Sequence, residues 1–182
     1  MGLDYIPQPC RSPCENPALT KILLVVYHSM TGGTHQMAQA LCDGAAQESG
    51  VAVRLLHASQ AHAADVLAAD ALVFATPENL AAMSGQLKDF FDRCYYDVLD
   101  QVNGRPYAAL VCAGSDGQGA VRQIERIATG WRLRAVAPAL VVCTHAQTRE
   151  AITAPKHIGP DDLARCHALG EALAAGLALG VF

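Results

Sequence analysis

The sequence predicts an α/β fold in which helices cover both faces of a parallel sheet, and three observations support this. Short apolar runs alternate with amphipathic stretches from residue 21 onward, which is typical of βαβ units. Hydrophobic residues make up 52% of the chain and charged residues 16%, as expected when strands are buried on both faces. A length of 182 residues suits one domain with a sizeable core.

Five strands are expected where short aliphatic runs occur. They cover residues 21–27, 51–56, 71–75, 106–113 and 137–144. Thr76-Pro77 is expected to end the third strand, because proline lacks the amide that the interior of a sheet requires.

Five helices are expected between and after these strands. The first ends near residue 48, and a short second helix covers about residues 61–68. The third follows Ser84, a suitable N-cap, and carries apolar residues three and four positions apart. Apolar residues at the same spacing mark a fourth helix near residues 121–131. The last begins near Pro160, since proline fits the first turn of a helix.

The first 20 residues differ in character from the rest. They contain four prolines and little apolar periodicity, which predicts an extended arm at residues 1–20 outside a domain at 21–182. Such an arm can pack on a partner subunit. Cys10 and Cys14 have the spacing of a metal-ligand pair, but no second pair of ligands accompanies them. Idle thiols are therefore the preferred interpretation.

The charge balance argues against large anionic partners. There are 13 basic and 17 acidic residues and no basic stripe, which disfavours nucleic acid and anionic membrane surfaces. No apolar run approaches the roughly 18 residues that span a bilayer, and no export signal is evident. Several of the seven cysteines lie in apolar stretches, which suits a reducing compartment. We expect a cytoplasmic protein with a small-molecule ligand.

The segment after the first expected strand combines hydroxyl groups with glycines. It consists of Ser29, Met30, Thr31, Gly32, Gly33 and Thr34. In open α/β sheets, ligands bind beyond the carboxyl ends of the strands. Hydroxyls, flexible glycines and the exposed amides of a helix N-terminus together form a site for an anion.

Other phosphate motifs do not fit this segment. No Gly-Lys-Ser/Thr follows, so a Walker loop is excluded, and two adjacent glycines do not match the dinucleotide fingerprint. A single terminal phosphate fits better, with its charge met by amides, hydroxyls and the helix dipole because no lysine or arginine lies in the loop. The alternative is an ordinary glycine-rich turn in which Thr34 caps the helix.

Two motifs in this order resemble a known family. Ser29-x-Thr31-Gly32-x-Thr34 is similar to the phosphate loop of the flavodoxin-like superfamily. Residues 83–92, Met-Ser-Gly-Gln-Leu-Lys-Asp-Phe-Phe-Asp, resemble a segment of NAD(P)H-quinone reductases of the tryptophan-repressor-binding-protein type and of NADPH-dependent FMN reductases. The resemblance implies a flavodoxin-like three-layer αβα sandwich, a five-stranded parallel sheet in the order 2-1-3-4-5, and non-covalent FMN.

The resemblance also implies that three loops hold the FMN. Residues 29–34 would bind the phosphate, and residues 76–83 and 112–119 would border the isoalloxazine ring. The expected ring contacts are Thr76, Pro77, Glu78, Asn79, Leu80, Met83, Cys112, Gly114, Ser115, Asp116, Gly117 and Gly119. Glu78 and Asn79 would meet the polar ring edge, and amides of the third loop would stabilise negative charge on the reduced flavin. The alternative for both segments is a simple polar turn.

No catalytic side chain is expected, because a flavin supplies its own redox chemistry. Neither ring loop contains Trp or Tyr, which leaves a face open for a nicotinamide. This favours an enzyme that transfers a hydride from NAD(P)H through FMN to a quinone, flavin or similar small-molecule acceptor. The alternatives are a flavodoxin-type electron carrier and a non-catalytic FMN-dependent regulatory protein.

Several features bear on the acceptor and the assembly. The quinone-reductase pattern Pro-Thr-Arg-Phe-Gly-Asn-Met matches residues 77–83 only at its ends, so the acceptor stays open. His28, His35 and His145 are candidate proton donors, with ordinary solvated or capping histidines as the alternative. Because open-faced flavins of this family are commonly completed across a subunit interface, the resemblance implies a homodimer or homotetramer.

Overall fold

The computed structural model describes residues 20–182. The expected arm, apart from residue 20, and the thiols Cys10 and Cys14 lie outside the described residues and stay predictions.

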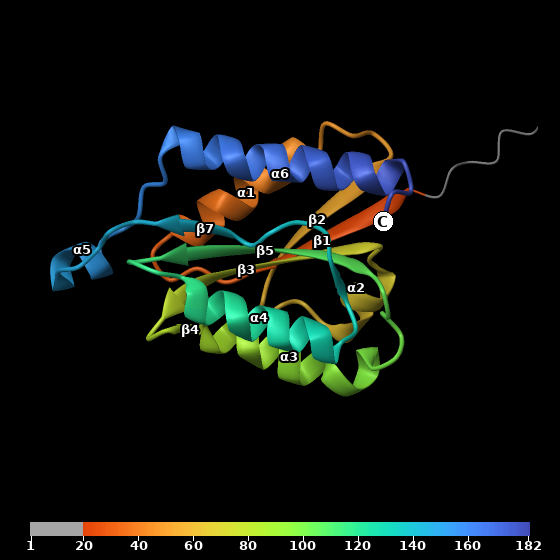
Figure 1. The fold of residues 1–182 in the computed structure, drawn as a ribbon, viewed down its shortest axis with the longest axis horizontal. Coiled ribbons are helices and arrows are strands. Elements are labelled where there is room, and N and C mark those ends of the chain that lie inside the picture. The colour runs from red at the N-terminus through yellow and green to blue at the C-terminus, as the bar shows by residue number, and fades with distance from the viewer. Residues whose placement is uncertain (1–19) are drawn as a thin grey trace, which may run out of the picture.

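The sheet has the predicted parallel order (Figure 1). Strand β1 (Lys21–Tyr27) lies between β2 (Val51–His57) and β3 (Ala71–Asn79), and β5 (Pro106–Ala113) pairs with β3. Beyond β5, the short strands β6 (Arg134–Ala135) and β7 (Leu140–Cys143) both pair with it in parallel. In chain order this is the arrangement 2-1-3-4-5, with a divided last strand.

The last strand starts later than expected. Residues 137–139, placed in it by the apolar pattern, lie between β6 and β7. Pro138 occupies this gap, and proline cannot donate to the ladder with β5. The strand is therefore interrupted rather than continuous.

Strand β3 runs past Pro77, where the sequence predicted its end. Pairing with β1 stops at Ala75, so β3 has a single parallel neighbour at Pro77. A proline is tolerated there because the missing amide faces no partner strand. The extension forms an unexpected antiparallel hairpin with β4 (Ala82–Met83).

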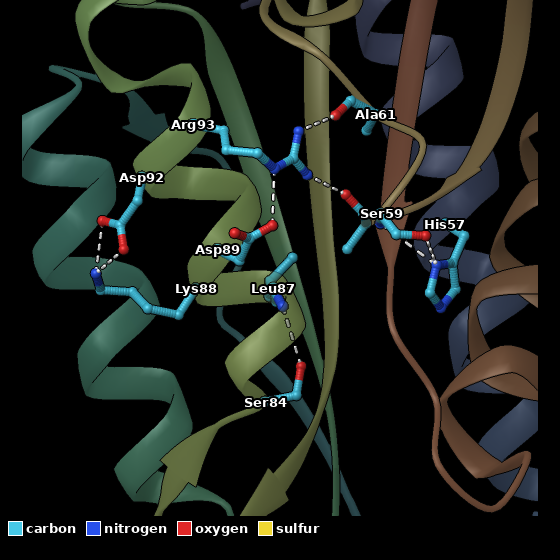
Figure 2. A network of polar contacts seen from close by, with 10 residues as sticks. His57, Ser59, Ala61, Ser84, Leu87, Lys88, Asp89, Asp92 and Arg93 are labelled. Atoms are coloured by element: carbon cyan, nitrogen blue, oxygen red, sulfur yellow. Dashed lines mark hydrogen bonds and ion pairs between the residues drawn. The ribbon is translucent and has the colours of Figure 1, made fainter.

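The helices form two layers, one on each face of the sheet (Figure 1). Helices α1 (Gly33–Ala45) and α6 (Pro160–Ala178) cover one face, and α2 (Ala63–Ala68), α3 (Gly85–Val98) and α4 (Gln118–Gly130) cover the other. The predicted cap of α3 is confirmed, since the Ser84 hydroxyl accepts the Leu87 amide at 3.3 Å (Figure 2). Trp131 packs in the core beside Phe74 and Phe91.

Helices α1 and α6 approach so closely that their backbones touch. A Cβ at Gly170 would lie 2.0 Å from the Leu41 carbonyl oxygen, and one at Gly44 would lie 2.1 Å from that of His167. Only glycine fits at these distances. This packing fixes α1, whose N-terminus follows the Ser29–Thr34 segment.

A five-residue helix, α5 (Arg149–Thr153), was not expected. It lies at the same end of the molecule as the β3–β4 hairpin, near the carboxyl ends of the sheet strands (Figure 1). Within residues 20–182, no helix combines the length and hydropathy needed to cross a bilayer. The expected cytoplasmic location stays a prediction.

Candidate functional site

A cavity of about 690 Å³ lies beyond the carboxyl ends of β1, β3 and β5. All three predicted loops contribute to its lining. The predicted residues that line it are Ser29, Met30, Thr31, Gly33, Thr34, Pro77, Glu78, Asn79, Leu80, Cys112, Gly114 and Ser115. The predicted residues outside the lining are Gly32, Thr76, Met83, Asp116, Gly117 and Gly119.

The two glycines of the first loop have different roles. Gly32 precedes α1 with φ of +88°, a conformation that residues with a Cβ rarely adopt. Its amide donates to the Ser29 hydroxyl at 3.1 Å. A Cβ at Gly33 would lie 2.7 Å from the Cys112 Sγ atom, so Gly33 permits the loop to approach β5. Together they hold the start of α1 against the cavity.

Thr34 does not cap α1. The capping position belongs to Gly32, and no side chain caps the helix. The Thr34 side chain lies within the first turn, is 1% exposed, and its hydroxyl has no hydrogen-bond partner in the described part of the chain. A buried hydroxyl without a partner is costly. A bound anion at this helix N-terminus would satisfy it.

Lys156 was not predicted as a site residue, yet it lines the cavity. Its amide donates to the Thr31 carbonyl at 2.7 Å, and its Nζ atom donates to three carbonyls at and after the end of α5. Gln36 fixes the same segment, since its side chain bonds the Lys156 carbonyl and the Ile158 amide. A cation that the sequence did not reveal therefore lies near the loop, although none lies within it.

The segment around Lys156 supplies further lining residues that the sequence did not reveal. They are Thr144, Ala146, Ile152 and Thr153, to which Ala81 and Ala113 add small apolar surfaces. Residues 144–156 follow the last strand without clear periodicity, and Lys156 is 125 positions from Thr31. No local signal in the sequence connects the two.

The Glu78 carboxylate accepts hydrogen bonds from backbone amides at the N-terminus of α4. It accepts the amides of Gly117 at 2.7 Å, Gly119 at 2.9 Å and Ala120 at 3.2 Å. These are the amides expected to face a reduced flavin, and Glu78 was expected to meet the ring. The carboxylate also complements the positive end of the α4 dipole. In this structure both groups serve to join the hairpin to α4.

The β3–β4 hairpin has an unusual two-residue turn. Leu80 and Ala81 have φ values of +51° and +61°, which fit a type I′ turn but are normally adopted there by Asn and Gly. The Leu80 side chain is fully exposed. The Ala81 carbonyl lies against Gly119, where a Cβ would come within 2.1 Å of it. The contact between the Ala81 carbonyl and Gly119 thus helps to hold the two turn residues in their left-handed conformation.

Hydrogen bonds at Thr76 and Met83 fix the base of the β3–β4 hairpin. The buried Thr76 hydroxyl accepts the Ser84 amide at 3.0 Å and bonds the Ser84 hydroxyl. The Met83 amide donates to the Gln123 side chain at 3.0 Å. Both residues position the loop rather than line the cavity.

Burial shifts the pKa of two groups near the cavity. Burial raises the pKa of the Cys112 thiol to about 11, although Lys156 opposes this, so the thiol stays protonated. Burial, together with His57, lowers the pKa of His28. His28, His35 and His145 do not line the cavity. Among residues 20–182, no group of three or more His, Cys, Asp or Glu side chains is arranged to hold a metal ion.

Comparison with known proteins gives a family match over most of the chain. The family of NADPH-dependent FMN reductases matches residues 35–148. A flavodoxin of Aquifex aeolicus is 36% identical over 97 residues, covering 53% of this chain and 52% of that protein. An NAD(P)H dehydrogenase (quinone) of Acidithiobacillus ferrooxidans is 33% identical over 91 residues, covering 39% of this chain and 46% of that protein. The chain spans about half the length of these relatives.

Solved structures share the fold at low sequence identity. A flavodoxin from the domain Archaea has a TM-score of 0.69 at 20% identity, covering 86% of this chain and 98% of that chain. A flavodoxin, WrbA-like protein from Agrobacterium tumefaciens has a TM-score of 0.69 at 21% identity, with coverages of 88% and 98%. A flavodiiron protein from Giardia intestinalis has a TM-score of 0.71 at 21% identity, covering 90% of this chain and 37% of that chain. These matches confirm the predicted flavodoxin-like sandwich.

Proposed function

The chain belongs to the NADPH-dependent FMN reductase family, and from this premise we propose that it is an oxidoreductase that binds FMN in the 690 Å³ cavity. NAD(P)H is the proposed co-substrate, and a quinone, a free flavin or a similar small molecule is the proposed electron acceptor. FMN, when bound, supplies a ring that accepts and donates hydride. The chain positions that ring and controls what reaches it.

The Thr34 hydroxyl carries this proposal. It is buried at the N-terminus of α1 and belongs to the cavity lining, and within residues 20–182 it makes no hydrogen bond of normal geometry, its nearest polar neighbour being the weakly bonding Cys112 thiol. The first amides of α1 and the Ser29 and Thr31 hydroxyls are the accompanying donors. These groups suit a phosphate monoester because each donates a hydrogen bond without requiring a second charge. Lys156 adds a positive charge at the rim of the same cavity.

The remaining lining suits a flavin ring with an accessible face. Met30 and Leu80 are exposed apolar side chains at the mouth, while Cys112 presents an uncharged thiol deeper in the cavity. In the part of the chain that the structure describes, none of the residues that line the cavity is aromatic. An enzyme that must admit a nicotinamide beside the ring requires such a face, whereas an aromatic side chain stacked on the ring would occupy it.

Two threonine substitutions test the cofactor site. Thr34→Val removes a hydroxyl that makes no hydrogen bond within residues 20–182, so we expect unchanged or higher stability and FMN affinity that is lower by roughly tenfold or more, the value of one hydrogen bond to a charged group. Thr76→Val is the matched control, because its hydroxyl bonds Ser84. It should lower stability more than FMN affinity. Fluorescence titration and urea unfolding measure the two quantities.

Anaerobic mixing of the FMN-loaded protein with NADPH or NADH tests the reaction. Loss of the oxidised flavin absorbance is the expected result, and its return on addition of a quinone or free FMN identifies the acceptor class. If neither nucleotide reduces the bound flavin, the proposed reductase activity is refuted.

The identity to a flavodoxin of Aquifex aeolicus favours a second candidate, an electron carrier without its own NAD(P)H activity. A carrier would be reduced by dithionite or by a protein donor, but not by NADPH or NADH. The mixing experiment therefore separates the two candidates directly.

We also propose a homodimer or homotetramer. Tyr96 on α3 is 83% exposed and Tyr95 is 40% exposed, so these aromatic side chains are available to an interface rather than used in the core. Sedimentation velocity of the full chain and of a Tyr96→Ser variant tests this, and a monomeric wild-type protein would contradict it.

A further inference from the structure

A second cavity, of about 680 Å³, lies beside the first. Its walls come from the β3–β4 hairpin, the start of α3 and the outer side of α4. Ala81, at the tip of the hairpin, lines both cavities. The two cavities therefore share a wall at the tip of the hairpin.

Among the residues that the structure describes, the charged lining of this second cavity is entirely basic. It contains Lys88, Arg122 and Arg126 and no Asp or Glu; we call these three residues the basic cleft. The Lys88 Nζ atom bonds Asp92 one turn further along α3 (Figure 2). Within residues 20–182, neither Arg122 nor Arg126 bonds any carboxylate.

This arrangement contrasts with the other cations of the described chain. Most of them have partners: Lys21 with Asp70, Arg54 with Asp65, Arg93 with Asp89, Arg132 with Asp100 and Arg165 with Asp162. Arg105 and Lys156 bond backbone carbonyls. Arg134 and Arg149 also lack side-chain partners in this part of the chain, but they lie on separate elements, β6 and α5.

Arg122 and Arg126 stand one turn apart on α4, so their like charges repel each other and cost helix stability. A guanidinium pair without carboxylates is suited to a ligand with several phosphate oxygens, which it binds through paired hydrogen bonds. The N-terminus of α4 is not available for such a ligand, since Glu78 accepts its amides. The arginine side chains are therefore the anion-binding groups of this cavity.

We propose that the basic cleft binds the adenosine 2′-phosphate of NADPH, and so makes the protein select NADPH over NADH. This inference rests on the proposed function, in which the nicotinamide enters the first cavity. A dinucleotide is too long for the nicotinamide pocket alone, and the shared residue Ala81 leads its adenosine end into the second cavity. The 2′-phosphate carries a charge of roughly −2 at neutral pH and is absent from NADH.

Direct binding provides the first test, on FMN-loaded protein so that the phosphate site of the first cavity is occupied. The probes are adenosine 2′,5′-bisphosphate and 5′-AMP, which lacks the 2′-phosphate. We expect calorimetry to show at least tenfold tighter binding of the bisphosphate, roughly the effect of one charge-assisted bond. This preference should disappear in an R122Q/R126Q variant and weaken with added salt.

The R134Q/R149Q variant is the matched control, because it removes the same two charges from exposed arginines outside the cleft. It should keep the preference for the bisphosphate. Equal binding of both probes by the wild-type protein, or equal losses in the two variants, would overturn the proposal.

Reduction kinetics provide the second test. In R122Q/R126Q the KM for NADPH should rise tenfold or more while that for NADH and both kcat values change little. If NADPH reduces the flavin and its KM is insensitive to these arginines, the cleft proposal fails and the reductase proposal stands. If neither nucleotide reduces the flavin but arginine-dependent bisphosphate binding persists, the reductase proposal fails and the cleft remains supported as a nucleotide phosphate site.

Discussion

The two sides of the main cavity are built by different means. On one side, residues 29–34 are positioned by backbone packing: Gly33 lies against Cys112, and α1 lies against α6 at Gly44 and Gly170. On the other side, the hairpin is positioned by side-chain bonds from Glu78 and Gln123, and its turn residues adopt left-handed conformations.

This difference suits the two roles proposed for the cavity, which are binding of the phosphate and selection of the substrate. A phosphate is the same in every flavin ligand, so its site can be fixed by backbone atoms that tolerate no side chain. In the proposed function the hairpin faces the position where substrates differ, and it is held by a few polar bonds that substitution can change.

Gly170→Ala should be the most damaging change. The new Cβ would lie 2.0 Å from the Leu41 carbonyl oxygen, and neither backbone can move without separating α1 from α6. We expect a loss of about 3 kcal/mol or more in the free energy of unfolding, the upper range for overpacking. Gly130→Ala is the control, because its Cβ would meet nothing within 4 Å. Equal urea midpoints for the two variants would show that α1 is not fixed by this contact.

Glu78→Gln should have an intermediate effect on the hairpin side. The amide side chain has one acceptor oxygen instead of two, so at least one of the α4 amides loses its partner. The cost is about 1–2 kcal/mol for a helix cap of this kind. Glu125→Gln, on the same helix, removes a carboxylate that makes no ion pair in the described chain and should be nearly neutral. A Glu78→Gln protein as stable as the wild type would show that the Glu78 carboxylate does not stabilise the contact between the hairpin and α4.

A Leu80→Asn/Ala81→Gly variant should gain stability by about 1 kcal/mol, because Asn-Gly is the preferred type I′ pair. Its turnover should fall, since Leu80 no longer contributes an apolar side chain to the cavity mouth. The single variant Ala81→Gly relieves backbone strain in the turn but keeps the Leu80 side chain, so it separates the effect on stability from the effect on turnover. Thermal unfolding and steady-state rates measure both effects, and no gain in the melting temperature would mean that the turn is unstrained.

The smallest effect concerns His28, at the start of the phosphate-side loop. Its pKa is lowered in the folded protein by burial and by His57, so the unfolded chain binds the proton more tightly. The associated stability is fully present above pH 6.5, the ordinary value, and is lost as the pH falls toward the lowered pKa. His28→Gln should reduce the difference in urea midpoint between pH 7.5 and pH 5. His157→Gln is the control that should leave that difference unchanged, because that side chain is exposed and makes no ion pair within residues 20–182.

Features that depend on residues close together in the chain could be predicted from the sequence. The alternation of apolar runs predicted a parallel sheet, and the resemblance to the flavodoxin-like superfamily predicted its strand order. The hydroxyls and glycines of residues 29–34 predicted an anion site, and the structure has a cavity beside them. The hairpin was missed because Leu80-Ala81 carries none of the usual turn residues. Lys156 and the bond between Glu78 and α4 were missed because each joins segments that are distant in the chain, and a single sequence contains no record of such pairs.

The turn at Leu80 and Ala81 also has a practical consequence. The contact of the turn with α4 runs through the Ala81 carbonyl against Gly119, and a carbonyl is present whatever the side chain is. Positions 80 and 81 are therefore suited to randomisation in directed evolution. A library confined to these two codons would sample new acceptors for a biocatalyst, while the flavin phosphate site and the α1–α6 contact stay as they are.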